Sequence, residues 1–504
     1  MSTPTGGRAP RVVVAGGGLA GMVAALRLAQ QGVDVDLYEA SSRLGGKAGS
    51  DRREHGLSDH GYHVFPAWYH NLWALVDELG IRDHFVPRRK FFRLGRAEAA
   101  ALSEDGPGLR RALHHAFMWP RTLLSSVDLV SRRRRYLEEL SLSGFLRSRW
   151  YNGLETGREL RDISLKGLGN PSWNASSLTY RQNMRLWLKV LHKPNWTAAD
   201  GSLQERFIEP IAAALGAAGV TVHLDTPITG IDVAGQDDDL AITALHVGGG
   251  ETIEARDAAV VLALPHERLR PLLAPHTNRL PAAVQDLGYL RSQPMVALDV
   301  HVSRPLEGLP TDGHVILDGS RFHLTLLDVR RLWGDRLPGD PDHPVLQLVA
   351  ADTKAIEGTG PAEMERALVD DLRAFFPYVR EEELEVVLHD NHDVPLFMND
   401  VGTDGRRPLS TRVYGRNLHL AGDWCRTPID LACMEGALVS GTQAAQAILR
   451  GAGRPEGPAL RLPSERASGG AWLLRTVLAP PLWLVGQPVD LYRWLRRRRE
   501  TGSH

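Results

Sequence analysis

The segment that most constrains this chain is RVVVAGGGLAGMVAALRLAQQGVDVDLYEA, close to the N-terminus. A β-branched run at 11–15 precedes a G-x-G-x-x-G pattern that starts at Gly16, and Met22–Gln31 and 33–38 follow as a helix and a second strand. In such a β-α-β unit the first glycine permits a tight turn, the second lets a pyrophosphate approach the backbone, and the third lets the helix pack closely on the strand. Glu39 closes the second strand, where a carboxylate binds a ribose 2′-hydroxyl and disfavours a 2′-phosphate. The segment predicts a dinucleotide site.

A second glycine motif, Arg43-Leu-Gly-Gly-Lys47, follows directly. Its glycine pair lets the backbone come close to a ligand, and its two cations offset pyrophosphate charge. The motif matches the R-x-G-G-[RK] sequence of glutathione-reductase-like flavoproteins, which indicates FAD as the dinucleotide. The alternative is a solvated basic loop.

A third motif at the far end of the chain fits the other half of the same cofactor. Leu418–Ala421 is typical of a short buried strand, which ends in Gly422-Asp423, and a helix rich in small residues begins near Met434. In FAD proteins of this kind the carboxylate binds the ribityl or pyrophosphate region. The positive end of the helix then points at the N1–O2 edge of the flavin. The alternative role of Asp423 is to cap a turn or helix.

Four further segments carry a family resemblance. These are Asp59-His-Gly-Tyr-His63-Val-Phe with Tyr69-His-Asn-Leu, then Asp200-Gly-Ser-Leu-Gln-Glu-Arg-Phe, AAVVLALPHERL and MEGALVSG. In this order they resemble the plant-type phytoene and ζ-carotene desaturases, a branch of the flavin amine oxidase superfamily that includes bacterial hydroxysqualene dehydroxylases. The resemblance covers residues 10 to 450. Its motifs are specific to the superfamily rather than to one activity.

The resemblance implies an α/β fold in which a glutathione-reductase-like Rossmann FAD domain is interleaved with an α+β substrate domain. A sheet over the flavin and a helical cap are expected in the second domain. The discontinuous FAD-binding domain is assigned to 8–89, 200–284 and 405–452. The substrate-binding domain is assigned to 90–199 and 285–404, and the C-terminal tail to 453–504.

The resemblance also implies residues for a noncovalent FAD. The expected cofactor-binding residues are Gly16, Gly18, Leu19, Ala20, Gly21, Glu39, Ala40, Arg43, Gly45, Gly46, Lys47, Gly422, Asp423, Met434, Glu435 and Ala437. His63, Glu435 and Arg426 are candidate polar groups near the flavin, and His63 and Glu435 are the candidate catalytic residues. A structural role is an equal alternative for His63. Cys425 follows Asp423, whereas the covalent cysteine of amine oxidases lies well before this motif.

Other classes of site are not expected. His55, His60, His63 and His70 cluster with Asp59 but lack the spacing of metal ligands, so no metal is expected. The net charge of −1 provides no overall field for nucleic acid. The presence of only two cysteines argues against a disulfide framework and favours a reducing cytoplasm.

Two segments indicate a membrane surface. HHAFMWPRTLLSSVDLVSRRRRYL and AWLLRTVLAPPLWLVGQPVDLYRWLRRRR each join an apolar, tryptophan-containing run to four consecutive arginines. Neither is expected to span a bilayer, because prolines and charges interrupt the second. Such a pattern is typical of an interfacial element on anionic lipid. The alternatives are a solvated helix face at Arg132–Arg135 and a C-terminal tail docked on the body. A peripheral position on the inner face of the cell membrane is therefore expected for a cytoplasmic protein.

We expect a FAD-dependent oxidoreductase that acts on an apolar polyprenoid, carotenoid- or squalene-like, by hydride transfer to flavin N5. Desaturation, isomerisation and dehydroxylation are all compatible with this chemistry, and a quinone or oxygen would accept the electrons. The alternative is a flavin amine oxidase that uses oxygen on a small amine or amino acid. A third hypothesis is a FAD-binding scaffold without activity.

Overall fold

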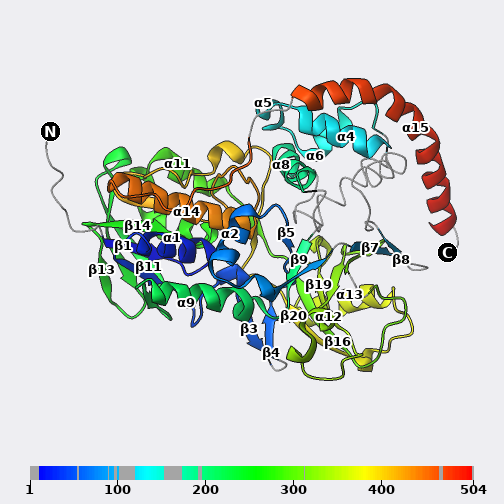
Figure 1. Cartoon of the computed structure of the whole chain (residues 1–504), viewed down its shortest axis with the longest axis horizontal. Helices are drawn as coiled ribbons and strands as arrows, with labels where there is room; N and C mark the ends of the chain where they lie inside the picture. Colours follow the sequence, from blue (N-terminus) through cyan, green and yellow to red (C-terminus); the bar gives the residue numbers. More distant parts are fainter. Residues whose placement is uncertain are drawn as a thin grey trace.

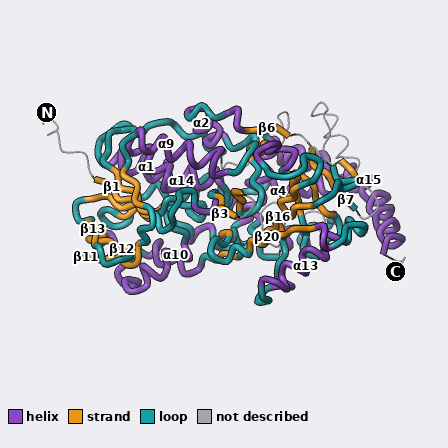
Figure 2. Tube along the Cα trace, turned by 90° about the horizontal axis from the view of Figure 1, so that it is seen from below, coloured by secondary structure: helices purple, strands orange, loops and turns teal. Residues whose placement is uncertain are grey.

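Two sheets organise the molecule, one in each of two lobes (Figure 1). The computed structural model describes residues 11–53, 56–88, 90–95, 99–101, 120–152, 173–190, 196–310, 313–464 and 469–501. The α/β class is confirmed, with a Rossmann-like parallel sheet in one lobe. Seen from below, this sheet lies at one end of the molecule and the C-terminal helix at the other (Figure 2).

The parallel sheet has five strands in the order β10-β2-β1-β14-β22. The strands are β1 (Arg11–Ala15), β2 (Val35–Tyr38), β10 (Thr221–His223), β14 (Ala258–Leu262) and β22 (Leu418–Leu420). Every neighbouring pair is parallel. Parallel sheets are covered on both faces, which explains why the central strands β1 and β14 are apolar apart from Arg11. Three distant parts of the chain therefore end at the same carboxyl edge.

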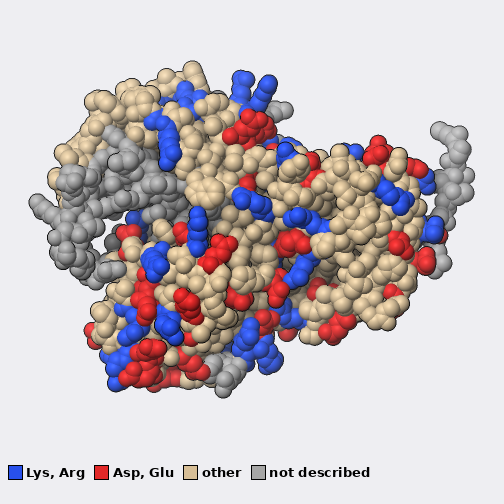
Figure 3. Space-filling model, turned by 180° about the vertical axis from the view of Figure 1, so that it is seen from behind, with Lys and Arg blue, Asp and Glu red and all other residues tan. Residues whose placement is uncertain are grey.

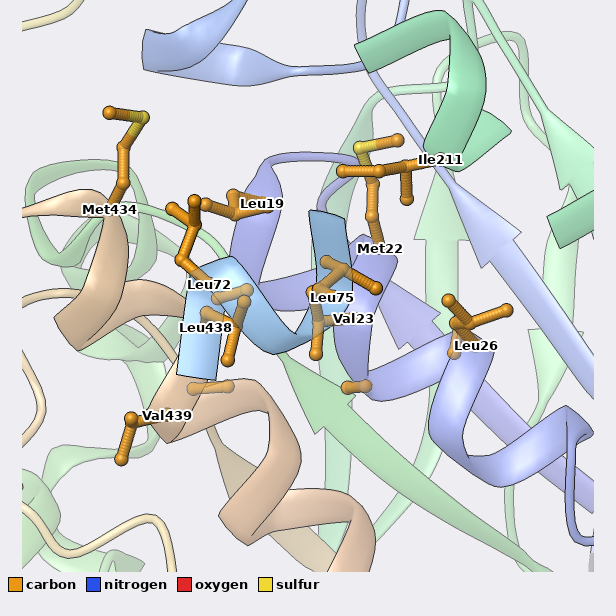
Figure 4. Packing of buried hydrophobic residues seen from close by; sticks show 14 of the residues in the cluster. Leu19, Met22, Val23, Leu26, Leu72, Leu75, Ile211, Met434, Leu438 and Val439 are labelled. Carbon is orange, nitrogen blue, oxygen red and sulfur yellow. The ribbon is translucent and has the colours of Figure 1, made fainter. Parts of the chain in front are cut away.

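Two hydrophobic cores cover the faces of this sheet. Side chains alternate along a strand, so Val12 and Val14 face one core while Val13 and Ala15 face the other. Figure 4 shows side chains from the helices of the first core meeting one another. These helices are α1 (Leu19–Ala29), α2 (His70–Glu78), α9 (Glu209–Ala217) and α14 (Met434–Gly451). The second core contains β11 (Ile228–Ala234), β12 (Ala241–Val247), β13 (Thr252–Glu254) and α10 (His266–Leu273).

Helix α1 begins at Leu19, one turn before the predicted start at Met22, and ends at Ala29. The predicted start was wrong because Gly21 was placed before the helix. The residue instead lies inside the first turn of the helix, where a Cβ on it would overlap the carbonyl oxygen of Gly16. Glycine is therefore required for the helix to start this close to β1.

The second lobe contains a seven-stranded sheet in the order β20-β16-β19-β18-β17-β7-β8. Its strands are β7 (Lys90–Leu94), β8 (Ala99–Ala101), β16 (Ala297–Val302), β17 (Gly313–Leu317), β18 (Thr325–Asp328), β19 (Val345–Val349) and β20 (Leu384–His389). One face packs its apolar side chains around α13 (Pro361–Arg373). Alternate residues such as Asp299 and Gln347 project to the opposite face, where both are buried.

A small helical cap stands beside this sheet. It comprises α4 (Pro120–Ser131), α5 (Arg134–Leu137), α6 (Leu142–Arg147) and α8 (Ser177–Leu188). The cap has a core of its own that includes Leu129, Phe145 and Tyr180. The long C-terminal helix α15 (Gly469–Thr501) arches over α4 (Figure 1).

Several short elements lie outside these two sheets. They are the hairpin β3 (Ser50–Arg53) and β4 (Gly56–Asp59), the sheet of β5 (Phe65–Pro66), β6 (Phe85–Arg88) and β9 (Trp196–Ala199), the pair β15 (Ser292–Gln293) and β21 (Leu396–Phe397), and the helices α11 (Ala282–Gln285) and α12 (Arg330–Trp333). A π-helical turn, Gln204–Ile208, leads into α9.

Candidate functional site

The first glycine loop joins β1 to α1 and leaves a free space beside its middle glycine. Gly18 is the residue that caps α1, and a Cβ built on it would meet no atom within 4 Å. The amides of the first helical turn are therefore accessible from this side. An anion binds well at such a helix N-terminus, so the loop fits a pyrophosphate.

Glu39 lies at this loop, as the sequence predicts for a ribose-binding acid. Its Oε2 accepts a hydrogen bond from the amide of Gly17 at 2.6 Å. Its Oε1 accepts hydrogen bonds from the amide and the hydroxyl of Ser41, both at 2.9 Å. The carboxylate is thus held at the end of β2 beside the glycine turn, and Ala40 follows it.

The Arg-Leu-Gly-Gly-Lys motif packs directly on the first loop. The amide of Gly45 donates to the carbonyl of Gly17 at 2.9 Å, and Gly18 and Gly45 form a parallel bridge. The two cations of the motif both face carboxylates of the chain. Arg43 donates to Asp51 at 2.5 Å, and the ammonium of Lys47 lies 3.9 Å from Glu267.

The third motif reaches the same edge of the sheet. The amide of Gly422 donates to the hydroxyl of Ser440 at 2.9 Å, which fixes the end of β22 to α14. Helix α14 packs closely on α1, because a Cβ on Gly441 would overlap the carbonyl of Ala20. Asp423 is half-buried, and no residue of the described ranges donates a hydrogen bond to its carboxylate. The three motifs therefore converge, and Asp423 is available to accept from a ligand.

Glu435 lies in the first turn of α14 but points at α2. It is fully buried, and its carboxylate accepts from the amides of Asn71 at 3.0 Å and Leu72 at 2.8 Å and from the side-chain amide of Asn71 at 2.7 Å. Burial raises the pKa of Glu435 to about 6, although these hydrogen bonds lower it. Such an arrangement is that of a carboxylate capping a helix N-terminus.

The same contact joins two motifs of the family resemblance. Asn71 belongs to the segment Tyr69-His-Asn-Leu, and a hydrogen bond links the side chain of Tyr69 to Cys433 just before α14. Asn71 also accepts from the amide of Arg461 at 2.7 Å and donates to its carbonyl at 3.1 Å. The start of α14 is thereby fixed to α2 and to the segment that leads into the C-terminal helix.

His63, the other candidate catalytic residue, is half-buried in the segment between β4 and β5. Burial, followed by the charge of the nearby His60, lowers the pKa of His63 to about 4. Its imidazole is therefore neutral at pH 7. The preceding residue, Tyr62, is held by the sheet of the second lobe, with its hydroxyl 2.6 Å from His314 and 2.5 Å from Thr325.

Sequence reasoning missed a histidine at the carboxyl edge of the parallel sheet. His266 is buried, with Nε2 2.8 Å from the hydroxyl of Ser292 and 3.3 Å from Glu267. Burial lowers the pKa of His266, while the Glu267 carboxylate opposes that shift. The available signal was its position immediately after a predicted strand end, where ligands bind in open α/β sheets.

A buried guanidinium holds the loop that follows Asp423. Arg407 donates to the carbonyls of Trp424 at 3.1 Å and Cys425 at 2.7 Å and to the carboxylate of Asp430 at 2.5 Å. Arg426, the third candidate polar group, is half-buried and lies 3.8 Å from Asp404. Sequence reasoning missed Arg407, since nothing local to its position indicates these partners.

A polar network is buried where the β3–β4 hairpin meets the seven-stranded sheet. Ser58 donates to Asp299 and lies 2.8 Å from Nε2 of His389, which also approaches Asp299 at 3.3 Å. Ser58 and Asp299 thus both contact the same ring nitrogen of His389, whereas in a hydrolytic triad the serine and the aspartate contact different ring nitrogens of the histidine. Asp59 accepts from Ser50 at 2.5 Å nearby, and burial raises its pKa to about 7.

Two further predictions concern metal and membrane. In the ranges that the structure describes, no group of three His, Cys, Asp or Glu side chains is placed to hold a metal ion; His55 lies outside them. The N-terminal part of the first arginine-flanked segment, 114–119, also lies outside the described residues. Among the helices described, we find none with the length and apolar character needed to cross a bilayer.

Comparisons with known proteins identify the family and the fold of this chain. The family described as flavin containing amine oxidoreductase matches residues 19–449. The 15-cis-phytoene desaturase of Synechococcus elongatus is 26% identical over 479 residues, which cover 88% of this chain and 98% of that protein. A single mutant of putrescine oxidase, redesigned in its cofactor binding, has a similar structure, with a TM-score of 0.67 at 18% identity over 88% of this chain and 100% of that one. Cyclohexylamine oxidase from Brevibacterium oxydans has a TM-score of 0.62 at 18% identity, covering 89% of this chain and 100% of that one.

Proposed function

We propose that this chain acts on an apolar polyprenoid of the carotenoid or squalene type. The chain belongs to the family of flavin-containing amine oxidoreductases and is a FAD-dependent oxidoreductase. The observation that carries the proposal is the match to a 15-cis-phytoene desaturase along nearly the whole of that protein. Desaturation, isomerisation and dehydroxylation of such a chain all remain within the proposal. The alternative substrate is a small amine or amino acid oxidised by oxygen.

The residues at the carboxyl edge of the parallel sheet fit FAD. Bound there, FAD would supply a hydride acceptor at N5. The helix amides beyond Gly18 would hold the pyrophosphate, Glu39 the adenosine ribose, and Asp423 the ribityl hydroxyls. The N-terminus of α14, with Met434 and Ala437, would place its positive end beside the flavin.

We infer that the cofactor is noncovalent. Burial raises the pKa of Cys425 and of Cys433 to about 12, so both thiols stay protonated at pH 7. A thiolate is the reactive form of cysteine, and neither residue supplies one. Precipitating the holoprotein with acid should release all of its flavin into the supernatant, and flavin that stays with the pellet would refute this inference.

The protein groups near the proposed substrate are suited to positioning more than to strong base catalysis. His63 is neutral at pH 7 and can orient a neighbouring group by a hydrogen bond. Loss of hydride from an allylic carbon leaves a stabilised cation, so a weak acceptor is sufficient for the proton that follows. We therefore propose that His63 contacts the substrate. Glu435 acts indirectly, by positioning the start of α14.

The experiment is turnover of polyprenoids by purified holoprotein. Phytoene, partly desaturated carotenes and hydroxysqualene are each dispersed in detergent with a quinone, and the products are separated by chromatography. We expect conversion of one of them, and no hydrogen peroxide when amines and oxygen are supplied instead. Unchanged polyprenoids together with peroxide release from an amine would establish the alternative.

The proposed partners follow from the substrate. An apolar polyprenoid resides in lipid, so we propose a peripheral protein on the inner face of the cell membrane, with a membrane quinone or oxygen as electron acceptor. No nucleic-acid partner is proposed. Comparing the reoxidation rate of reduced protein with quinone and with oxygen identifies the acceptor.

A further inference from the structure

Helix α15 presents an apolar surface that its packing on the cap leaves uncovered. Half of the large apolar side chains that are exposed within the described residues belong to this helix. They are Trp472, Leu473, Leu474, Val477, Leu484, Val485, Leu491, Tyr492 and Leu495. Single exposed apolar side chains are normal, but a continuous row of them marks an interaction site.

The outward face of α15 carries no charge over most of its length. From Gly470 to Val489 the only charged residue is Arg475, and it turns inward to donate to Asp128 of α4 at 2.9 Å. Pro480, Pro481 and Pro488 lack amide hydrogens and interrupt the hydrogen-bond ladder. The helix bends as a result, and its arch over α4 is visible in Figure 1.

A cluster of cations anchors the helix. Asp128 is buried and is surrounded by Arg132 at 2.7 Å, Arg149 at 3.5 Å and Arg475 at 2.9 Å, and it accepts from the hydroxyl of Tyr151 at 2.6 Å. Three guanidinium groups face one carboxylate, so the cluster has an excess of positive charge. The side chains of Arg132 and Arg149 keep 26% and 14% of their exposure, which leaves them within reach of an anion.

We propose that α15 lies in the interface of a bilayer containing anionic phospholipid. Its uncharged face inserts among the acyl chains, and the arginine cluster around Asp128 binds lipid phosphate. Trp150, which is 74% exposed, packs on Trp483 at 5.7 Å and marks the headgroup level, where tryptophan is favoured. The sequence adds four arginines at 496–499.

Charge complementarity selects this occupant over a second copy of the chain. Another copy would cover the apolar face but would bring its own arginine cluster close to the first. Anionic lipid satisfies both features, because basic residues beside an apolar helix face bind acidic headgroups. From behind, most side chains around the helical cap are uncharged, whereas acidic and basic side chains are mixed over the lobe of the seven-stranded sheet (Figure 3). This inference rests on the proposed function in one respect, because the apolar substrate proposed for the site would dissolve in the same bilayer.

The test is flotation of FAD-loaded protein with vesicles, without substrate. Vesicles of phosphatidylcholine alone are compared with vesicles containing phosphatidylglycerol as roughly one lipid in three. We expect binding to the anionic vesicles that weakens with salt, and a loss of about tenfold or more in the double variant V477E/L484E. The matched control is L224E/V413E, which adds the same charges at exposed apolar positions outside α15 and should bind like the parent.

A second pair of variants tests the cations. R132Q/R149Q should lose the preference for anionic over neutral vesicles, while R380Q, at an exposed arginine elsewhere, should keep it. Inorganic phosphate should compete no better than chloride at equal ionic strength, since stronger competition would indicate a site for free phosphate. Unchanged flotation of V477E/L484E overturns the proposal. The proposal is also overturned if the parent protein is a dimer, if V477E/L484E converts it to a monomer, and if neither protein floats with the vesicles. Failure of polyprenoid turnover in detergent leaves these outcomes unaffected.

Discussion

Replacing Glu435 by alanine distinguishes a capping carboxylate from a catalytic one. The substitution removes the acceptor of two buried amides, those of Asn71 and Leu72, whereas the Asn71 side chain retains the Arg461 carbonyl. A buried donor without an acceptor costs roughly 1–3 kcal/mol. Water entering the vacated space and the relief of a buried charge both reduce this loss, so we expect about 3 kcal/mol in total.

The assay combines three measurements on Glu435→Ala. Urea unfolding gives the loss of stability, absorbance gives the FAD content, and stopped flow gives the rate of flavin reduction in the fraction that holds FAD. We expect lower stability and FAD content with a reduction rate within about threefold of the parent. Glu363→Ala, at an exposed glutamate in the first turn of another helix, is the control. Unchanged stability and FAD content with reduction slowed roughly a hundredfold would refute the capping role and establish acid–base catalysis.

Three further predictions concern single buried features. Burial raises the pKa of Asp59 to about 7, so its proton stabilises the fold fully below about pH 4, the unfolded pKa, and that stability is lost as the pH rises through about 7. Asp59→Asn should flatten this fall in urea unfolding, and an identical pH profile would contradict the assignment. Arg407→Met should lower the free energy of unfolding by about 3–5 kcal/mol, because it leaves Asp430 buried and unpaired. Adding Asp430→Leu should recover part of this loss in thermal unfolding. If the effects of the two substitutions simply add, the two side chains do not form a stabilising ion pair. Gly21→Val should abolish the flavin absorbance of the purified protein, and a variant that remains yellow would disprove the close contact with Gly16.

The glycine motifs could be predicted because their chemistry is local. A turn, a helix start and a strand end occupy neighbouring positions, so the spacing from Gly16 to Glu39 defines the geometry by itself. The convergence of the third motif also followed, since parallel strands end at one edge of a sheet. The error at the start of α1 arose because Gly21 was placed before the helix, whereas its close contact with Gly16 is made from inside the first helical turn.

The remaining contacts of the site join residues whose partners are far away in the sequence. Nothing near Glu435 indicates that it faces Asn71, and periodicity carries no information about the partners of Arg407. The same holds for Asp128, whose arginines come from the end of α4, from the residues after α6 and from α15. The three prolines of α15 predict a broken helix, yet the chain forms a single bent one.

The central claim is that an apolar polyprenoid reduces the flavin of this protein. The most direct measurement is anaerobic absorbance of the holoprotein after mixing with detergent-dispersed polyprenoids, and separately with putrescine and other amines. We expect bleaching of the flavin band by at least one polyprenoid and none by amines. Bleaching by an amine alone would contradict it.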